Sequence, residues 1–90
     1  MKLIFCLACS DLVALRVGVK RTCFCGKSWG EYLDDSIAKI GGRALPVGFL
    51  NKSFVHAVKY QPEGGQGKTF EAFVIPKHCP TVQYEKEETR

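Results

Sequence analysis

The sequence predicts an α+β fold, with a cysteine-bearing hairpin at the N-terminus joined to a small, mainly antiparallel sheet with one helix. Four of the five cysteines lie within the first 25 residues. Short apolar runs separated by glycine and proline are typical of strands, and one segment carries apolar residues at helical spacing. The 90 residues, 46% of them hydrophobic, suffice for one domain. Because so short a chain buries only about 60% of its unfolded surface, the core is marginal and leaves room for a homodimer.

The cysteines near the N-terminus form two closely spaced pairs, C-x-x-C and C-x-C. Between the pairs, residues 13–16 and 19–22 are predicted to form two short strand arms around a turn at 17–18. A hairpin that closes on itself brings the residues at its two feet together. We therefore expect four sulfur atoms to meet at one point, from Cys6, Cys9, Cys23 and Cys25.

Four thiolates at one point are the ligand set of a tetrahedral Zn²⁺ site. The sequence therefore predicts a structural Zn²⁺ in a zinc-ribbon hairpin over residues 1–28. Four protein ligands leave no position for an activated water, so the predicted site is non-catalytic. Reduced or disulfide-paired cysteines are the alternative, although an odd number of cysteines cannot be fully paired within one chain.

The rest of the chain is predicted to add strands and one helix. Extended segments are expected over 30–34, 36–40 and 43–50, and Pro46 indicates that the last is irregular or at an edge. Each of these segments is bounded by acidic turns or glycines, which favour chain reversal.

The helix is predicted over Lys52–Tyr60, with Asn51 as its N-cap and Ser53 as a competitor for that role. The run Thr69–Ile75 is predicted to be a central strand, since it is apolar on both faces. We expect one zinc-stabilised domain over residues 1–82 and a charged, frayed tail over 83–90.

The central stretch combines glycine, a cation and a polar helix start, a combination that suits a groove for a partner loop or a small anionic, nucleotide-like ligand. The simpler interpretation is a strand-to-helix turn with a capping asparagine. The candidate binding residues are Gly42, Arg43, Asn51, Ser53 and Phe54.

A second candidate surface is basic and aromatic, as in proteins whose cations bind phosphates and whose rings stack on bases. Its candidate residues are Arg16, Lys20, Arg21, Lys27 and Trp29. Acidic residues are interleaved with them at Glu31, Asp34 and Asp35, and the formal charge is only +4. A solvated basic face is the competing interpretation.

A cysteine-dependent enzyme is the third hypothesis, because His78 stands beside Cys79. Neighbouring residues seldom have the geometry of a nucleophile and its base, and no orienting carboxylate is evident. We therefore expect no catalysis. No apolar run approaches the roughly 18 residues of a membrane span, so no membrane partner is expected.

The chain contains the motifs Cys6-x-x-Cys9, Cys23-x-Cys25-Gly26, Gly30-x-Tyr32, Pro46-x-Gly48-Phe49-x-Asn51-x-Ser53-Phe54 and Phe70-x-Ala72-Phe73-Val74-Ile75-Pro76, followed by Cys79-Pro80-Thr81. In this combination it resembles a group of small uncharacterised zinc-ribbon proteins of bacteria and bacteriophages. The resemblance implies a structural zinc and a cytoplasmic setting, and no established activity.

The leading hypothesis is a non-catalytic zinc-ribbon binding protein, of the kind that acts as a phage-type inhibitor by binding a host protein or sequestering a nucleotide-like ligand. The alternative is a nucleic-acid-binding zinc ribbon, an accessory factor in transcription or replication. Tight, salt-dependent binding to DNA or RNA separates the two.

Overall fold

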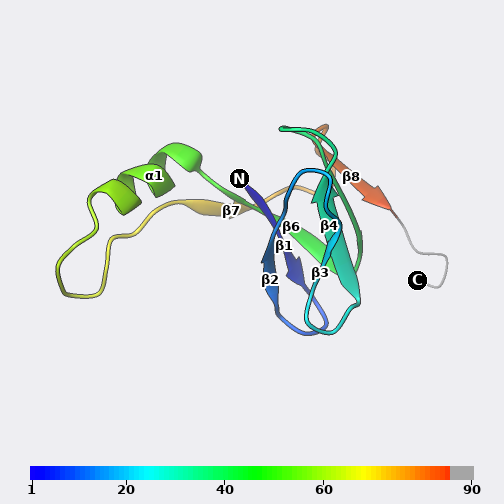
Figure 1. The fold of residues 1–90 in the computed structure, drawn as a ribbon, viewed down its shortest axis with the longest axis horizontal. Coiled ribbons are helices and arrows are strands. Elements are labelled where there is room, and N and C mark those ends of the chain that lie inside the picture. The colour runs from blue at the N-terminus through cyan, green and yellow to red at the C-terminus, as the bar shows by residue number, and fades with distance from the viewer. Residues whose placement is uncertain (86–90) are drawn as a thin grey trace.

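The structure, a computed structural model, describes residues 1–85 and contains two small sheets and one helix in that range (Figure 1). In chain order the elements are β1 (Lys2–Cys6), β2 (Leu12–Ala14), β3 (Arg21–Thr22), β4 (Ser28–Tyr32), β5 (Ala38–Gly42), β6 (Ala44–Phe49), α1 (Asn51–Lys59), β7 (Ala72–Val74) and β8 (Val82–Glu85). The predicted α+β class is confirmed.

The two sheets each have four strands, in the orders β2-β1-β6-β7 and β3-β4-β5-β8. All pairs are antiparallel except β5 with β8, which is parallel. The sheets enclose one core, in which Ile4 from β1 and Ile40 from β5 are almost fully buried. Cys6 and Cys23 belong to the same buried cluster, so the cysteine-bearing segments are part of the sheets.

The predicted turn at residues 17–18 is confirmed, because Gly18 has a φ of 72° and Arg16 forms a bridge with Val19. Beyond that bridge the two arms do not pair with each other as predicted. β2 pairs with β1 and β3 pairs with β4, so each arm belongs to a different sheet. The cysteine pairs occupy the turns of these two hairpins, and the arms only carry the chain from one sheet to the other.

The strand around Pro46 is interior, between β1 and β7, and not at an edge as expected. The Pro46 carbonyl accepts a hydrogen bond from Ile75 N–H at 3.0 Å. In an antiparallel strand the nitrogen of a residue points to the same side as its carbonyl. The missing N–H of Pro46 therefore faces the chain just beyond the end of β7, and no hydrogen bond between β6 and β1 is lost.

The run predicted as a central strand is a three-residue edge strand, β7, whose side chains are all exposed. Two of its aromatic residues pack outside the main core. The Phe73 ring covers Gly48, where an added Cβ would lie 2.6 Å from that ring. Phe70 packs against Phe49 and Phe54 with ring centroids 5.0 and 4.8 Å away.

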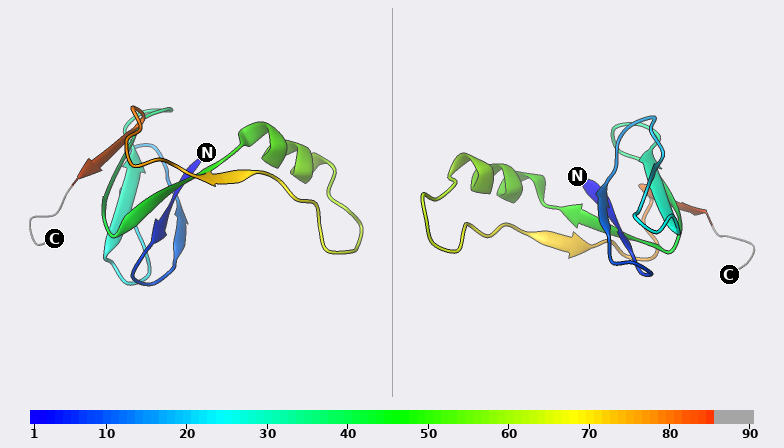
Figure 2. Two further views of the ribbon diagram at one scale, coloured as in Figure 1. Left: turned by 180° about the vertical axis from the view of Figure 1, so that it is seen from behind. Right: turned by 60° about the horizontal axis from the view of Figure 1, so that its bottom comes forward.

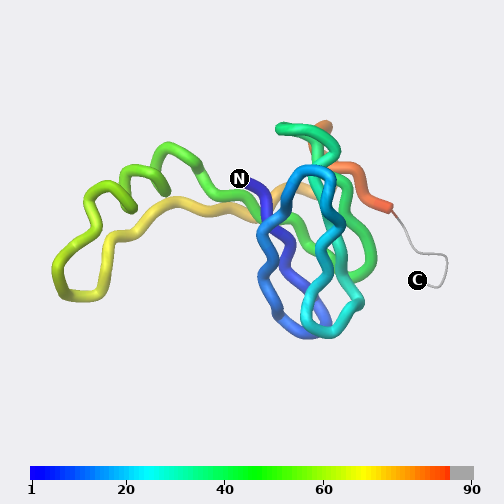
Figure 3. The backbone as a smooth tube through the Cα atoms, viewed as in Figure 1, coloured from blue at the N-terminus to red at the C-terminus, as the bar shows by residue number. Residues whose placement is uncertain are grey.

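Helix α1 and residues 60–71 project from the sheets as an arm, which gives the molecule principal extents of 49 × 26 × 23 Å (Figure 2). Figure 3 follows the chain outward along α1 and back to β7. The helix begins and ends one residue before the predicted bounds. Leu50 is its N-cap residue, and no side chain caps it, so the predicted capping role of Asn51 and Ser53 is wrong.

The expectation of a frayed tail over 83–90 is wrong for residues 83–85. Residues 82–85 form β8, which pairs with β5, because Val82 packs against the core and Tyr84 donates its hydroxyl to the Gly42 carbonyl at 2.5 Å. The remaining part of the expected tail, 86–90, lies outside the described residues.

Candidate metal centre

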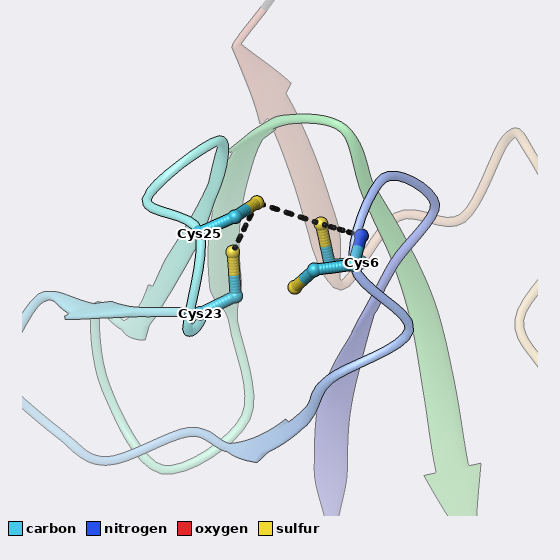
Figure 4. Close-up of side chains that lie close together, drawn as sticks. Cys6, Cys23 and Cys25 are labelled. Atoms are coloured by element: carbon cyan, nitrogen blue, oxygen red, sulfur yellow. Dashed lines mark hydrogen bonds between the residues drawn. The ribbon is translucent and has the colours of Figure 1, made fainter.

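The four predicted cysteine ligands meet between the turns of two hairpins, and Figure 4 labels three of them, Cys6, Cys23 and Cys25. Cys6 ends β1 and Cys9 follows in the β1–β2 turn, while Cys23 and Cys25 lie in the β3–β4 turn. Their sulfur atoms all lie within 4.8 Å of one another. The structure thus brings together all four residues that the spacing selected.

The two turns have the same hydrogen-bonding frame although one is C-x-x-C and the other C-x-C. Cys6 N–H donates to Asp11 and its carbonyl accepts from Ser10, at 2.9 and 2.8 Å. Cys23 N–H donates to Ser28 and its carbonyl accepts from Gly26, at 3.0 and 3.1 Å. We call these two turns the knuckles.

Each knuckle also needs a left-handed residue after its second cysteine. Gly26 has a φ of 79°, and Ser10, with a φ of 63°, is the only non-glycine residue with positive φ among residues 1–85. A glycine adopts this conformation without a steric cost, whereas a serine pays one. The strained Ser10 is therefore explained by the position that it holds in the knuckle.

The sulfur positions fit a tetrahedral metal ion. Cys25 Sγ lies 3.8 Å from Cys6 Sγ and 3.5 Å from Cys23 Sγ. Four sulfurs at about 2.3 Å from a central Zn²⁺ would be separated from one another by about 3.8 Å. The four cysteines can therefore hold a metal ion with little movement.

Backbone donors around the cluster favour thiolates. Cys6 Sγ accepts from the N–H groups of Ala8 and Cys9 at 3.3 and 3.4 Å, and Cys23 Sγ accepts from Ser28 N–H at 3.4 Å. Burial alone would raise the pKa of Cys6, but hydrogen bonds to its sulfur, including those from Ala8 and Cys9 N–H, outweigh it and lower the pKa to about 6.

The Ser28 hydroxyl supports the same conclusion. Its oxygen is fully buried and has no hydrogen-bond partner among residues 1–85. A buried hydroxyl without a partner is costly. A Cys6 thiolate bound to a metal would supply the acceptor that this hydroxyl lacks.

The pKa of the fourth thiol, that of Cys25, is shifted in the opposite direction. Lys27 N–H lowers the pKa of Cys25, but burial and contacts with the other three cysteines outweigh it and raise the pKa to about 11. Four thiols in contact cannot all ionise, because like charges repel. A divalent cation removes this conflict by replacing the shared protons.

The knuckles project two apolar side chains away from the cluster. Phe24, between the two ligands of the second knuckle, is 92% exposed, and Leu7 in the first is 51% exposed. Leu7 N–H donates to Arg43, and Arg43 N–H donates to Lys27, at 3.0 and 2.9 Å. The backbone of Arg43 is therefore hydrogen-bonded to both knuckles, and the Lys27 and Arg43 side chains are exposed.

No family model, curated protein or solved structure matches the chain. The chemistry of the site must therefore be read from its own geometry. Among residues 1–85, no helix is long and apolar enough to cross a membrane.

The five candidate binding residues are not brought together. Gly42 and Arg43 lie beside the knuckles, whereas Asn51, Ser53 and Phe54 lie beyond the other end of β6, a strand of about 20 Å. The five residues therefore do not line a single groove in the described part of the chain.

Most of these five residues have internal structural roles. Gly42, with a φ of 71°, packs so closely on Lys27 that an added Cβ would overlap the Lys27 carbonyl oxygen. Asn51 accepts a hydrogen bond from the N-terminal ammonium at 2.5 Å. The Ser53 hydroxyl joins α1 to the returning chain, accepting from Glu71 N–H at 2.8 Å and donating to the Leu50 carbonyl at 3.1 Å.

Phe54 has an internal contact too, in the aromatic trio that it forms with Phe49 and Phe70. It also lines a pocket of about 470 Å³ between α1 and the glycine-rich loop. Arg43 is the one residue of the five that is exposed without a side-chain partner in the described chain.

The candidate nucleic-acid contacts are only partly available. The Trp29 ring lies between Gly41, whose added Cβ would overlap it, and the Lys20 ammonium, 4.4 Å from the ring centroid. The Arg21 guanidinium donates to the Ala14 carbonyl at 2.8 Å. Arg16 and Lys27 are exposed.

Cys79 lies apart from the metal cluster and contacts Thr81 Oγ1 at 3.3 Å. That hydroxyl lowers the pKa of the thiol. The neighbouring His78 is exposed and forms no hydrogen bond with the sulfur within residues 1–85.

Sequence reasoning missed Ser10, Ser28 and Phe24 as parts of the site. Ser10 had a usable signal, because it occupies the place after C-x-x-C that Gly26 occupies after C-x-C. Ser28 had none, since nothing local indicates that a serine three residues after Cys25 is buried against Cys6.

Proposed function

We propose that the protein is a non-catalytic zinc protein of the cytoplasm, in which a structural Zn²⁺ holds the two knuckles as a surface for binding another protein. The observation that carries the proposal is the set of four cysteine sulfurs within 4.8 Å of one another. All-sulfur tetrahedral sites are typical of structural zinc. The five unpaired cysteines favour a reducing compartment.

The four cysteines fill the coordination sphere of Zn²⁺, so no position is left for water or substrate. The ion would act on the fold: it joins the turn of one sheet to the turn of the other at the end where both hairpins close. Binding is then the function of the surface that the ion holds rigid.

That surface fits a protein partner. Leu7 and Phe24 are exposed on turns that the ion would hold rigid, and preorganised apolar anchors cost little entropy on binding. Lys27 and Arg43 beside them favour a partner with acidic residues around an apolar pocket. Such a surface would suit a phage-type inhibitor that acts by binding a host protein.

The zinc part is tested with two substitutions at cysteines outside the fully buried core. Cys25 is exposed and Cys79 is half-buried, so neither change to serine leaves a large cavity. The proposal predicts one zinc per wild-type chain and per Cys79→Ser chain, and loss of tightly bound zinc in Cys25→Ser. Equal zinc contents in both variants would contradict it.

The binding part is tested by capturing proteins from lysate of the source cells, identifying the partner and reconstituting the complex from purified components. Phe24→Ala is expected to weaken that complex by about 2 kcal/mol or more, the scale of an interfacial hot spot. The matched control is Leu33→Ala, which removes a side chain 47% exposed in the β4–β5 loop. A complex unaffected by Phe24→Ala would refute this surface.

The nucleic-acid alternative is tested on the same preparations. Binding to DNA or RNA that weakens steeply with salt, and that Lys20→Ala or Arg16→Ala reduces, would support a nucleic-acid-binding protein instead.

A further inference from the structure

The outer edge of β7 is unusual, because it is uncharged, apolar and open. Its residues Ala72, Phe73 and Val74 are all exposed, Phe73 by 50% and Val74 by 63%. Edge strands are normally protected by charges, bulges or covering elements. Only Pro76, just after the strand, acts in this way here.

The hydrogen bonds around β7 define which backbone groups are available. Glu71 and Ile75 bond to Leu50 and Pro46, on the β6 side. Because bonding direction alternates along a strand, Ala72 and Val74 direct their N–H and C=O groups away from β6. β7 is the last strand of its sheet, so these groups face outward.

Alternate positions along this segment form a self-complementary series in the sequence: Glu71, Phe73, Ile75 and Lys77, the last at a bend that follows the extended chain. Within residues 1–85 the Glu71 carboxylate and the Lys77 ammonium have no hydrogen-bond or ionic partner. The two charges stand at equal distances on either side of Val74.

We propose that β7 pairs antiparallel with β7 of a second copy, about a two-fold axis at Val74. In this register Glu71 lies opposite the second copy's Lys77, and Phe73 lies opposite the second copy's Ile75, each pair occurring twice. The Val74 residues of the two copies exchange two backbone hydrogen bonds, and each Ala72 N–H reaches the other copy's Pro76 carbonyl.

Proline does not conflict with this register. Pro76 supplies an acceptor and lacks only a donor, so one bond per chain is lost. Isologous pairing of this kind is self-limiting at this edge, because the two β7 strands occupy each other. The two sheets join into one of eight strands, the size at which twisted open sheets still occur.

The exposed surface of the arm is a further reason to expect this dimer. α1 has nine residues, of which only Ala57 is buried, and Val55 and Val58 are 62% and 60% exposed. Helices of this length are marginal without tertiary packing. Antiparallel pairing of β7 lays each arm beside the sheets of the other copy, and so covers a segment that otherwise projects alone (Figure 2).

The test is the mass of the zinc-loaded full chain, measured by sedimentation equilibrium over micromolar to millimolar concentrations. We expect twice the 10.0 kDa of the chain. Val74→Pro removes the central outward donor and is expected to give a monomer. Glu71→Lys and Lys77→Glu each place like charges opposite one another and are expected to weaken the dimer about tenfold.

The double variant Glu71→Lys with Lys77→Glu restores both pairs and is expected to return the dissociation constant to near the wild-type value. Glu63→Lys, the same charge change in the loop of the arm, is the matched control and is expected to have little effect. Zinc content and far-UV circular dichroism verify that each variant is folded.

A chain that stays monomeric at millimolar concentration overturns the proposal and leaves this edge for a strand of another protein. A dimer insensitive to Val74→Pro and to both charge reversals overturns it as well, because its interface then lies elsewhere. Neither outcome affects the zinc proposal, which rests on the knuckles.

Discussion

At the scale of single residues, the fold requires glycine at several positions, and the physical reason differs from one position to another. Gly18 and Gly42 have nearly the same φ, 72° and 71°. An added Cβ at Gly18 meets nothing within 4 Å, whereas one at Gly42 would overlap the Lys27 carbonyl oxygen. A substitution at Gly18 therefore measures the cost of the backbone conformation alone. A substitution at Gly42 adds the cost of close packing beside the second knuckle.

Gly42→Ala and Gly18→Ala are predicted to differ sharply in stability. Gly18→Ala is expected to cost about 1 kcal/mol, the left-handed penalty less the unfolded-state entropy that glycine loses. Gly42→Ala adds overpacking and is expected to cost about 3–5 kcal/mol. Denaturant unfolding of the zinc-loaded proteins measures both. Equal costs would mean that the contact between Gly42 and Lys27 does not exist in solution.

At the scale of elements, the molecule divides into two regions with separate supports. The sheets share one core with the metal cluster. The arm depends on the aromatic trio of Phe49, Phe54 and Phe70, whose centroids lie 4.8–5.3 Å apart, and on the Ser53 hydroxyl that links α1 to Glu71. The arm is therefore expected to unfold locally before the sheets.

Phe54→Ala is predicted to release the arm while leaving the metal centre intact. Removing one ring of the trio should cost about 1–3 kcal/mol, less than a fully buried phenylalanine. We expect faster amide exchange over 51–59 and faster proteolysis within 60–71, with zinc content unchanged. Val55→Ala, on the exposed side of α1, is the control. Loss of zinc in Phe54→Ala would contradict the separation of the two regions.

The elements also show what local sequence can and cannot predict. The cysteine set followed from spacing alone, and the helix was predicted to within one residue at each end, because both depend on near neighbours. The pairing of β2 and β3 was predicted wrongly, since strands of two or three residues carry no signal that selects a partner. Asn51 and Ser53 were misjudged because sequence does not tell whether a polar side chain will bond to its own helix or to distant backbone.

At the scale of the whole molecule, the metal is expected to decide whether the chain folds. Domains of this size have net stabilities of about 5–15 kcal/mol, and structural Zn²⁺ sites contribute about 10–16 kcal/mol. Here Cys6 and Cys23 are buried inside the core, so an ion bound to both would join the two sheets. The two quantities are comparable, which leaves the apoprotein little stability of its own.

Removing the metal is therefore predicted to abolish the cooperative thermal transition or to lower the melting temperature by about 20 °C or more. A strong chelator with a reductant gives the apoprotein, and calorimetry gives the transition. Added Zn²⁺ should restore it, whereas Mg²⁺, which prefers oxygen ligands, should not. An apoprotein that melts at the same temperature would mean that the fold does not depend on the site.

The central claim is that the four cysteines hold one Zn²⁺ by sulfur alone. X-ray absorption at the zinc edge of the protein purified without added metal tests it most directly. The proposed site predicts four sulfur atoms at about 2.3 Å and no nitrogen or oxygen ligand. A first shell containing nitrogen or oxygen, or a preparation without zinc, would contradict the account.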